Sequence, residues 1–298
     1  MELFGRDLNT EVCLVAEIGS NHEGDRDRAW ELALMASGAG ADAIKYQSYT
    51  TELLYHPDDA RFEQAKKFEL SDEDLLWLQA RVVIPTFASC ITHDKAEFLG
   101  ENFPAIKIAS ADLTHKPTIE ACVATGKPLL ISTGMANYEE ILATSHLTSY
   151  PELGRAAPYW DEEHVESVVW MHCVSAYPTS LEDSHVALGV ATMQEFGSYV
   201  GYSNHTPGIA ACLSAIACEA SVVEVHFTDK KDGRDFRDHA LSCDAADLRM
   251  LRHLGDDIKL TLAPGGEIQG CLKRIFDCEI GNRKRMRKDK KTGFRGLT

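Results

Sequence analysis

The sequence lacks the features that mark several classes of protein. None of its nine cysteines has a partner at CxxC spacing, which argues against a structural zinc site or a disulfide framework and fits a reducing compartment. No apolar run reaches the ~18 residues of a membrane span, and residues 1–19 lack the basic-then-apolar layout of a signal peptide. Basic residues are scarce, 30 Lys and Arg against 46 Asp and Glu, so a nucleic-acid partner is not expected, although a few local cations could still hold an anionic substrate. We therefore expect a soluble, cytoplasmic protein.

The 298 residues do contain a series of short apolar, β-branched runs, which are typical of parallel strands buried on both faces. We predict eight strands, at residues 12–18, 43–47, 82–87, 105–109, 128–132, 165–172, 199–203 and 222–227. Helical patterns separate most of them, at residues 26–38, 71–79, 117–125 and 206–220. This alternation predicts an α/β fold, a closed (β/α)8 TIM barrel, although an open doubly wound sheet would show the same alternation.

The barrel is expected to occupy residues 1–265, followed by a short basic C-terminal tail at 266–298 and no second domain. The tail could cover an active site or bind an anionic sugar phosphate, or it could simply be solvated. Long interruptions of the strand–helix alternation lie at residues 50–70 and 149–163. The first is either a lid or substrate loop or a solvated excursion.

Polar or ionisable side chains end all eight predicted strands, where an active site is assembled in this fold. Lys45 and Lys107 lie within apolar strands, and burying a charge without a partner is costly. Two lysines together with several serines suit a small dianionic ligand, such as a phosphate ester that also carries a carboxylate. The structural alternative is a salt bridge of each lysine with Glu17 or Glu224.

Two histidines, His205 and His226, end the neighbouring seventh and eighth strands. Two neutral imidazoles with a carboxylate and open water positions suit manganese, iron, cobalt or zinc. His239 is interpreted as a loop residue that contacts substrate or shapes the site. His172 is interpreted either as a packed core residue or as a functional one.

Eight motifs carry a family resemblance, each at or near the end of a predicted strand. They are VAEIGSNHEGD, GADAIKYQ, KIASADLTHKP, GKPLLISTGMA, MHCVSAYP, GYSNHTPG, VEVHFTDK and RDHALS. Together, over about residues 12–252, they resemble the barrel domain of the N-acetylneuraminate (sialic acid) synthase family, which includes legionaminate, pseudaminate and spore-coat polysaccharide synthases.

The resemblance implies an enzyme that condenses phosphoenolpyruvate with an open-chain, N-acetylmannosamine-like sugar aldehyde. The products would be phosphate and a 2-keto-3-deoxy sugar acid, and the cofactor a divalent metal, Mn²⁺ first, with Mg²⁺, Co²⁺, Fe²⁺ or Zn²⁺ as alternatives. By motif position, phosphoenolpyruvate would be surrounded by Lys45, Ser89, Lys107, Ser110, Ser132, Ser175, Tyr177 and Ser203. The metal would be held by His205 and His226, and the catalytic carboxylates would be Glu17 and Asp112. Asn21, Gln47 and His239 would contact the substrate or shape the site.

The chain also departs from the family. Members typically read SDHT where this chain has Asn204 before His205, which could alter the surroundings of the metal. The loop that usually reads STPFD is here ASCIT, which keeps the hydroxyl of Ser89. The residues after Leu254 are too few for the antifreeze-like domain that sialic acid synthases commonly carry across a homodimer. The acceptor is therefore expected to be held differently, to be smaller, or not to be a sialic acid precursor, and a homodimer remains possible.

Two other functions fit the same residues. A Schiff-base aldolase would use Lys107 or Lys45 as a partly neutral amine in an apolar pocket. A non-catalytic barrel would bind phosphoenolpyruvate or a sugar without turnover.

Overall fold

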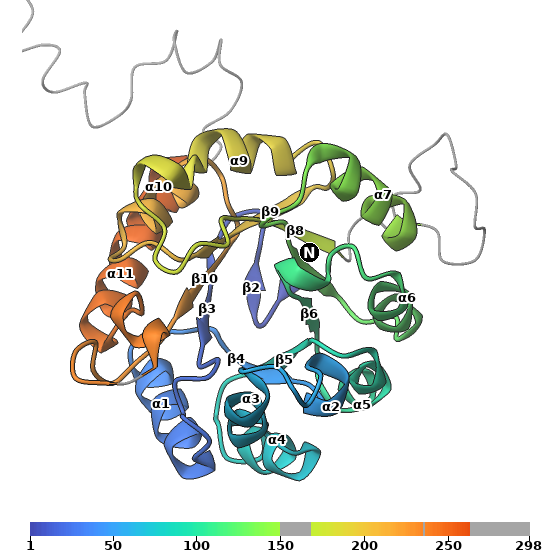
Figure 1. Ribbon diagram of the computed structural model, residues 1–298. Helices are drawn as coiled ribbons and strands as arrows, with labels where there is room; N and C mark the ends of the chain where they lie inside the picture. The colour runs from blue at the N-terminus through green and yellow to red at the C-terminus, as the bar shows by residue number, and fades with distance from the viewer. Residues whose placement is uncertain (150–167, 235, 263–298) are drawn as a thin grey trace, which may run out of the picture. The chain divides into compact units, whose positions relative to one another are not determined.

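The structure, a computed structural model, describes residues 1–149, 168–234 and 236–262. Eight parallel strands close into a barrel in the order β10-β3-β4-β5-β6-β7-β8-β9 (Figure 1). The strands are β3 (Cys13–Glu17), β4 (Ala43–Ser48), β5 (Thr86–Cys90), β6 (Ile106–Ile108), β7 (Leu129–Ser132), β8 (Val168–Cys173), β9 (Tyr199–Asn204) and β10 (Val222–His226). The closed ring confirms the predicted (β/α)8 fold and excludes the open sheet.

Helices surround the barrel (Figure 1). They are α1 (Arg26–Gly38), α2 (Thr51–Leu54), α3 (Phe62–Phe68), α4 (Asp72–Gln79), α5 (Ala96–Asn102), α6 (Lys116–Ala124), α7 (Tyr138–Ser149), α9 (Val186–Met193), α10 (Ala210–Ala217) and α11 (Ala245–Leu262). Helix α1 begins where the Asp25 side chain accepts hydrogen bonds from two free backbone amides, and α4 begins at a capping box on Ser71. Both helices match their predicted ranges closely.

Two predicted ranges differ from the observed elements for backbone reasons. The third strand was predicted at 82–87, but β5 starts at Thr86, because Pro85 has no amide hydrogen to donate to a sheet. The helix predicted at 206–220 is shortened to α10, since Pro207 and Gly208, with φ at 80°, form a turn before it. The strand predicted at 165–172 begins outside the described residues and is observed from Val168.

The amino-terminal end of the barrel is closed by packing and by one buried carboxylate. A hairpin of β1 (Glu2–Leu3) and β2 (Arg6–Asp7) lies across the barrel (Figure 1), with the Phe4 ring 4.9 Å from that of Phe87. Asp42 accepts hydrogen bonds from Arg6 Nε (2.7 Å), Arg252 Nη1 (2.8 Å) and the Leu14 amide (2.7 Å). The Asp42 carboxylate therefore links the N-terminal hairpin and β3 to the last helix, α11, at this end of the barrel.

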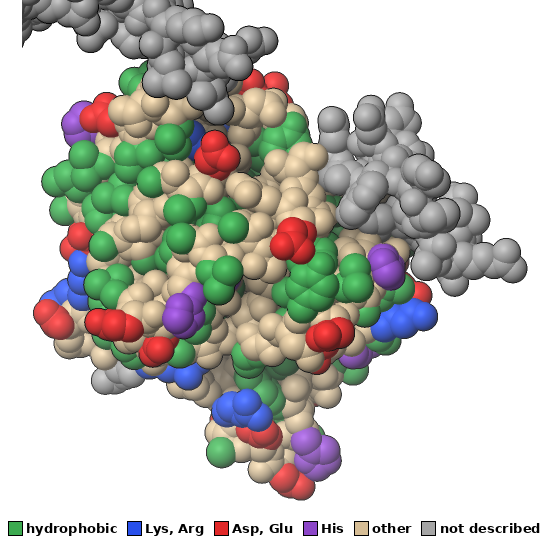
Figure 2. All heavy atoms as spheres, turned by 90° about the horizontal axis from the view of Figure 1, so that it is seen from above, with side chains coloured by type: hydrophobic (Ala, Val, Ile, Leu, Met, Phe, Trp, Pro, Cys, Tyr) green, Lys and Arg blue, Asp and Glu red, His purple; other side chains and the backbone are tan. Residues whose placement is uncertain are grey.

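The outer surface includes an uncharged area over α9 and α10, two helices that contact each other. Neither helix contains a charged residue, and Leu188 on α9 is 72% exposed. Figure 2 shows hydrophobic side chains gathered on this side of the molecule. In a chain of net charge −16, such an area is unusual.

The domain prediction can be compared with the described residues only in part. Met1–Thr261 form one compact unit, which contains the whole barrel. The predicted boundary at 265 and the tail at 266–298 lie outside the described residues, as does the interruption at 149–163 from residue 150 onward. Within the described residues, no helix has the length and apolarity needed to cross a membrane.

Candidate active site

A cavity of about 810 Å³ lies at the carboxyl ends of the strands. Every one of the eight strands contributes at least one lining side chain, as the fold predicts for an active site. All of the predicted site residues line it except Asn21 and His239. The interruption at 50–70, which contains α2 and α3, also lines the cavity, so it borders the site rather than projecting away from it.

A buried ionic cluster forms the floor of the cavity. Lys45 Nζ lies 3.2 Å from Glu17 Oε2 and 3.2 Å from Glu224 Oε2, and it donates a hydrogen bond to Ser89 Oγ. Lys107 Nζ lies 3.9 Å from Glu224 Oε1. The salt bridges considered as a structural alternative are therefore present, and the same lysines face the cavity.

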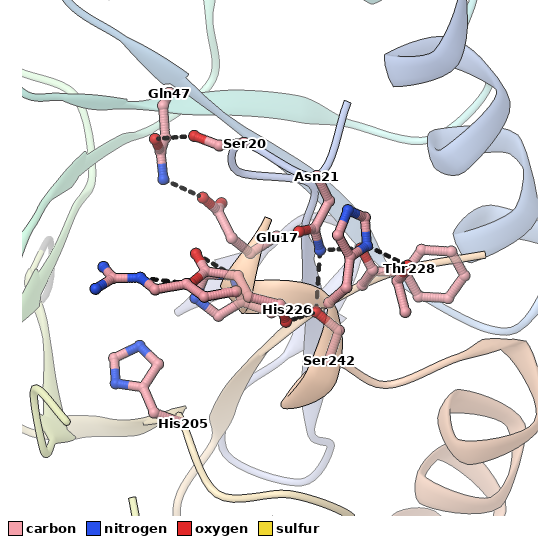
Figure 3. A network of polar contacts seen from close by, with 12 residues as sticks. Glu17, Ser20, Asn21, Gln47, His205, His226, Thr228 and Ser242 are labelled. Atoms are coloured by element: carbon pink, nitrogen blue, oxygen red, sulfur yellow. Dashed lines mark hydrogen bonds and ion pairs between the residues drawn. The ribbon is translucent and has the colours of Figure 1, made fainter. Parts of the chain in front are cut away.

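Hydroxyl groups surround these charges. Lys107 Nζ donates to Ser132 Oγ at 2.6 Å, and Ser203 Oγ donates to Glu224 Oε1 at 2.9 Å. Gln47 Nε2 donates to Glu17 Oε1 at 3.0 Å (Figure 3). The cluster thus offers both positive charge and hydroxyl groups to an anion that enters the cavity.

The two carboxyl groups of the cluster differ in their protonation. Burial raises the pKa of Glu17 to about 7, against the opposing effect of Lys45. At Glu224 burial also raises the pKa, but Lys107 and Lys45 outweigh it and the net shift is downward. Glu17 can therefore exchange a proton near neutral pH, whereas Glu224 stays ionised as the counter-charge of both lysines.

Asp112 is a second carboxyl group that titrates near neutral pH. It ends the 3₁₀ helix Ser110–Asp112, directly after β6, and its Oδ2 has no hydrogen-bond partner among the described residues. Burial raises its pKa to about 7, with Lys107 acting in the opposite direction. Such a group can serve as a general acid or base.

His205 and His226 come together as their places at neighbouring strand ends predict. Their ring centroids lie 5.4 Å apart, and both residues are labelled in Figure 3. His205 Nδ1 lies 2.7 Å from the Val174 carbonyl oxygen, which can only accept, so Nδ1 carries a hydrogen and the neutral ring has its lone pair on Nε2. His226 Nδ1 is buried without a hydrogen-bond partner among the described residues.

The protonation of the two imidazoles bears on metal binding. Burial, followed by the neighbouring His205, lowers the pKa of His226 and keeps that ring neutral. At His205 burial lowers the pKa, but the Cys173 sulfur and the Val174 carbonyl outweigh it and raise it overall. The pair fits a divalent metal as two of its ligands. Within residues 1–149, 168–234 and 236–262, no group of three His, Cys, Asp or Glu side chains has a suitable arrangement, so water or substrate oxygens would complete the coordination.

A second part of the cavity is built from small side chains. The Gly134 amide donates to Ser110 Oγ at 3.1 Å. A Cβ atom at Gly134 would lie 2.3 Å from Ser175 Oγ and 2.9 Å from Ser110 Oγ. Any larger residue would force these two serine side chains to move, whereas glycine lets a backbone amide and two hydroxyl groups face one small volume.

Two predicted site residues, Asn21 and His239, do not line the cavity. They hold in place a loop whose other residues line the cavity. Asn21 Nδ2 donates to the Phe227 carbonyl at 2.8 Å and to Ser242 Oγ at 3.0 Å (Figure 3). His239 lies 3.2 Å from Glu23 Oε1 and 2.7 Å from Thr228 Oγ1. Both contacts hold the 3₁₀ helix Arg237–Ala240, whose first two residues line the cavity.

The NeuB family model matches residues 32–265, which is most of the chain. The chain belongs to the NeuB family. It is 36% identical over 240 residues to an uncharacterized protein of Methanocaldococcus jannaschii, covering 79% of this chain and 67% of that protein. It is 30% identical over 270 residues to the N,N'-diacetyllegionaminic acid synthase of Legionella pneumophila, covering 85% and 73%.

A solved structure supports the same placement. The N-acetylneuraminic acid synthetase of Leptospira borgpetersenii, crystallised with citrate, superposes with a TM-score of 0.79 at 26% identity, covering 94% of each chain. These comparisons confirm the predicted family and the predicted class of enzyme, a carbon–carbon bond-forming transferase of sialic acid synthase type.

Asn204, where NeuB relatives were expected to have aspartate, has a local role in this chain. Its Oδ1 accepts from the Thr206 amide (3.1 Å) and the Thr206 hydroxyl (2.7 Å), and its Nδ2 donates to the Thr206 carbonyl. These bonds fix the turn that contains His205. Asn204 thus shapes the surroundings of one imidazole through the backbone.

The predicted site left out several cavity residues, among them Glu224, which had been considered only as a salt-bridge partner of the lysines. Glu224 lies two positions before His226 on β10 and therefore points to the same face of the strand, a signal that was readable from the sequence. Asp238, within the RDHALS motif, lies 3.9 Å from His226 Nδ1 through its Oδ2. Arg237 lines the cavity beside it. His172, by contrast, hydrogen bonds to the Ser184 carbonyl at 2.7 Å and does not line the cavity, which favours its core role.

Proposed function

We propose that this chain condenses phosphoenolpyruvate with an N-acetylmannosamine-like sugar aldehyde, forming a 2-keto-3-deoxy sugar acid and phosphate. The observation that carries the proposal is the cavity floor, where two buried lysines, several hydroxyl groups and two carboxyls of raised pKa lie beside a pair of imidazoles. The relatives support it, since they include synthases of legionaminic acid, pseudaminic acid and N-acetylneuraminate 9-phosphate.

Phosphoenolpyruvate would bind over the ionic cluster. Lys45 and Lys107 supply its positive charge, and the hydroxyl groups on neighbouring strands complete the oxygen contacts; these are Ser89, Ser110, Ser132, Ser175, Tyr177 and Ser203. An arriving anion favours protonation of Glu17, because the pKa of that carboxyl is already about 7. Protonated Glu17 no longer neutralises the charge of Lys45, so the Lys45 ammonium group can interact with the ligand.

His205 and His226 would hold the divalent metal, with Mn²⁺ as the expected ion. When bound, the metal supplies Lewis acidity to an aldehyde oxygen. An aldehyde held beside these histidines would be near Tyr177, whose ring centroid is 4.1 Å from that of His205. Orientation of the two substrates against each other supplies much of the rate in such a site.

The chemistry balances with protons moved by two carboxyl groups. Carbon 3 of phosphoenolpyruvate bonds to the aldehyde carbon, whose oxygen becomes a hydroxyl group. Water adds to carbon 2, and the bond from carbon 2 to the bridging oxygen breaks, which releases phosphate and leaves a keto group. Glu17 and Asp112, each with a pKa raised to about 7, would take one proton from the water and deliver one to the former aldehyde oxygen; the second proton of the water leaves with the phosphate.

One observation favours the aldolase as a second candidate. Burial lowers the pKa of Lys107, which is a requirement for an amine that forms a Schiff base. Its hydrogen bond to Ser132 and its proximity to Glu224 support ligand binding instead. Borohydride reduction in the presence of pyruvate and of phosphoenolpyruvate separates the two, because only the aldolase would become covalently modified at Lys107.

We further propose that residues 1–265 form the catalytic barrel of a cytoplasmic homodimer, with 266–298 as an extension. The uncharged outer faces of α9 and α10 support the dimer, since two chains of net charge −16 would repel each other least there (Figure 2). Sedimentation of the wild type and of a Leu188→Glu variant tests this surface.

The proposed reaction is tested by phosphate release from phosphoenolpyruvate. Metal-free protein is assayed with and without Mn²⁺ across a panel of aldoses that includes N-acetylmannosamine. We expect phosphate only when the metal and one suitable aldose are both present. Phosphate release without any aldose, or no binding of phosphoenolpyruvate by calorimetry, contradicts the proposal.

A further inference from the structure

Arg237 stands apart from the other cations of the cavity. The described lining contains Lys45, Arg61, Lys107 and Arg237. The two lysines face Glu17 and Glu224, and Arg61 binds Asp59 through both Nε and Nη2. Arg237 donates only Nε, to Asp238 Oδ1 at 3.2 Å, and its two Nη groups have no hydrogen-bond partner among the described residues.

The guanidinium of Arg237 is placed by an aromatic ring. The Cζ atom of Arg237 lies 4.9 Å from the centroid of the Tyr177 ring. The centroid of the same Tyr177 ring lies 4.1 Å from that of the His205 ring. The Tyr177 ring therefore lies next to both the His205 imidazole and the Arg237 guanidinium. A sugar whose aldehyde lies at the imidazoles can extend along Tyr177 and bring its far end to the guanidinium.

The loop that carries Arg237 is held in place on its inner side. Phe236 packs edge-on against Phe68 of α3, with ring centroids 5.4 Å apart. Ser242 Oγ donates to the Asp238 carbonyl at 2.6 Å and is itself bonded by Asn21. The side chain of Arg237 is nevertheless 68% exposed. Its backbone is held in place, its Nε is paired with Asp238, and its two Nη groups remain exposed and open to an anion.

We infer that Arg237 is a specificity-determining residue that selects an acceptor aldose carrying an anionic group at the end remote from its aldehyde. A planar guanidinium with two free Nη groups matches the oxygen spacing of a phosphate or a carboxylate. Neutral sugars gain nothing from it. The inference rests on the proposed function, because it assumes that the aldehyde lies at His205 and His226.

The test compares each sugar with its charged form. Mn²⁺-loaded wild type and the variants R237A and R237K are assayed for phosphate release with N-acetylmannosamine and its 6-phosphate, and with mannose, mannose 6-phosphate and mannuronate. The readout is the ratio of kcat/KM between the charged and the neutral sugar. The matched control is R81A, which removes an arginine stacked 4.0 Å over Trp77 and outside the cavity.

We expect the wild type to prefer a charged sugar and R237A to lower that preference roughly 10- to 100-fold, the range for hydrogen bonds to a charged group. R237K should recover part of it, R81A should leave it unchanged, and 0.5 M salt should weaken it. The better of the phosphate and carboxylate arms identifies the anionic group. A wild type that prefers neutral sugars, or an R237A that lowers both rates equally, overturns the inference.

Failure of the proposed function gives a different result. If no aldose releases phosphate, binding of N-acetylmannosamine 6-phosphate to the Mn²⁺-loaded wild type and R237A is measured by calorimetry. Affinity lost in R237A alone would sustain the anion subsite while the reaction is rejected. Equal affinity, or no binding by either protein, would reject the subsite as well.

Discussion

Replacement of Glu224 by glutamine is expected to destabilise the barrel strongly, because this carboxylate is the counter-charge of two buried lysines. Its oxygens lie 3.2 Å from Lys45 Nζ and 3.9 Å from Lys107 Nζ, and the side chain is 4% exposed. At an effective dielectric constant of about 20, each pair contributes roughly 4–5 kcal/mol of attraction. Desolvation of the carboxylate offsets part of this, and removal of one partner from a buried pair typically costs about 3–5 kcal/mol.

The variant E224Q keeps the shape of the side chain, so the loss comes from charge. We expect its melting temperature, followed by near-ultraviolet circular dichroism, to fall by at least about 6 °C. Saturating phosphoenolpyruvate should then raise the melting temperature of E224Q more than that of the wild type, because the ligand's anionic groups replace the missing carboxylate beside the lysines.

The control is E31Q, which changes an exposed carboxylate on α1 that does not line the cavity and should alter stability by less than about 0.5 kcal/mol. If E224Q melted with the wild type, the ionic cluster would contribute no stability and the reasoning would be refuted. If it were destabilised but gained no more from phosphoenolpyruvate than the wild type, the lysines would not be the anion site.

Further predictions address other parts of the cavity. Because burial raises the pKa of Asp112 to about 7, the contribution of Asp112 to the free energy of unfolding is present below its unfolded pKa near 4 and is lost as pH rises through 7. D112N should abolish that loss, which is followed by urea midpoints measured from pH 4 to 8. The same variant should remove an ionisation near pH 7 from the kcat/KM profile. Chelation should stop turnover, and H226A should no longer bind Mn²⁺ in electron paramagnetic resonance titrations, whereas retained binding would contradict the ligand assignment. G134A, whose Cβ would lie 2.3 Å from Ser175 Oγ, should weaken phosphoenolpyruvate binding by about 5- to 150-fold in calorimetry, the effect of 1–3 kcal/mol of overpacking. N21A should raise KM for the acceptor more than for phosphoenolpyruvate, since Asn21 braces the loop on the acceptor side; an equal rise in both would contradict this role.

The architecture was readable from the sequence because buried parallel strands leave a strong signal. Continuous apolar runs between amphipathic helices located all eight strands, and their closure into a ring was confirmed. The ends of the helices and strands were predicted less accurately. Because of Pro85, β5 starts later than predicted, and because of a turn at Pro207 and Gly208, α10 is shorter than predicted. Local backbone chemistry at such positions competes with the apolar pattern.

The site was predictable to the extent that strand ends converge. Lys45, Lys107, His205 and His226 were expected to meet, and they line one cavity. Salt bridges of the lysines with Glu17 or Glu224 were considered as an alternative to ligand binding, but the sequence did not show that Lys45 lies 3.2 Å from both carboxylates while it also faces the cavity.

The RDHALS motif at residues 237–242 is a second place where the sequence did not show which side chains face the cavity. The RDHALS motif suggested His239, yet the side chains that reach the cavity from this motif are those of Arg237 and Asp238, two positions and one position earlier. A 3₁₀ helix at Arg237–Ala240 turns successive side chains to different sides, and no apolar pattern announces it.

The most direct test of the central claim follows the carbon atoms themselves. Phosphoenolpyruvate labelled with ¹³C at carbon 3 is incubated with the Mn²⁺-loaded protein and the best acceptor aldose, and the products are observed by ¹³C nuclear magnetic resonance. Our account predicts that the labelled methylene becomes bonded to a hydroxyl-bearing carbon of the former aldose, with one phosphate released for each new bond. Labelled pyruvate and phosphate as the only products would contradict it, because the cavity would then hydrolyse phosphoenolpyruvate without joining it to a sugar.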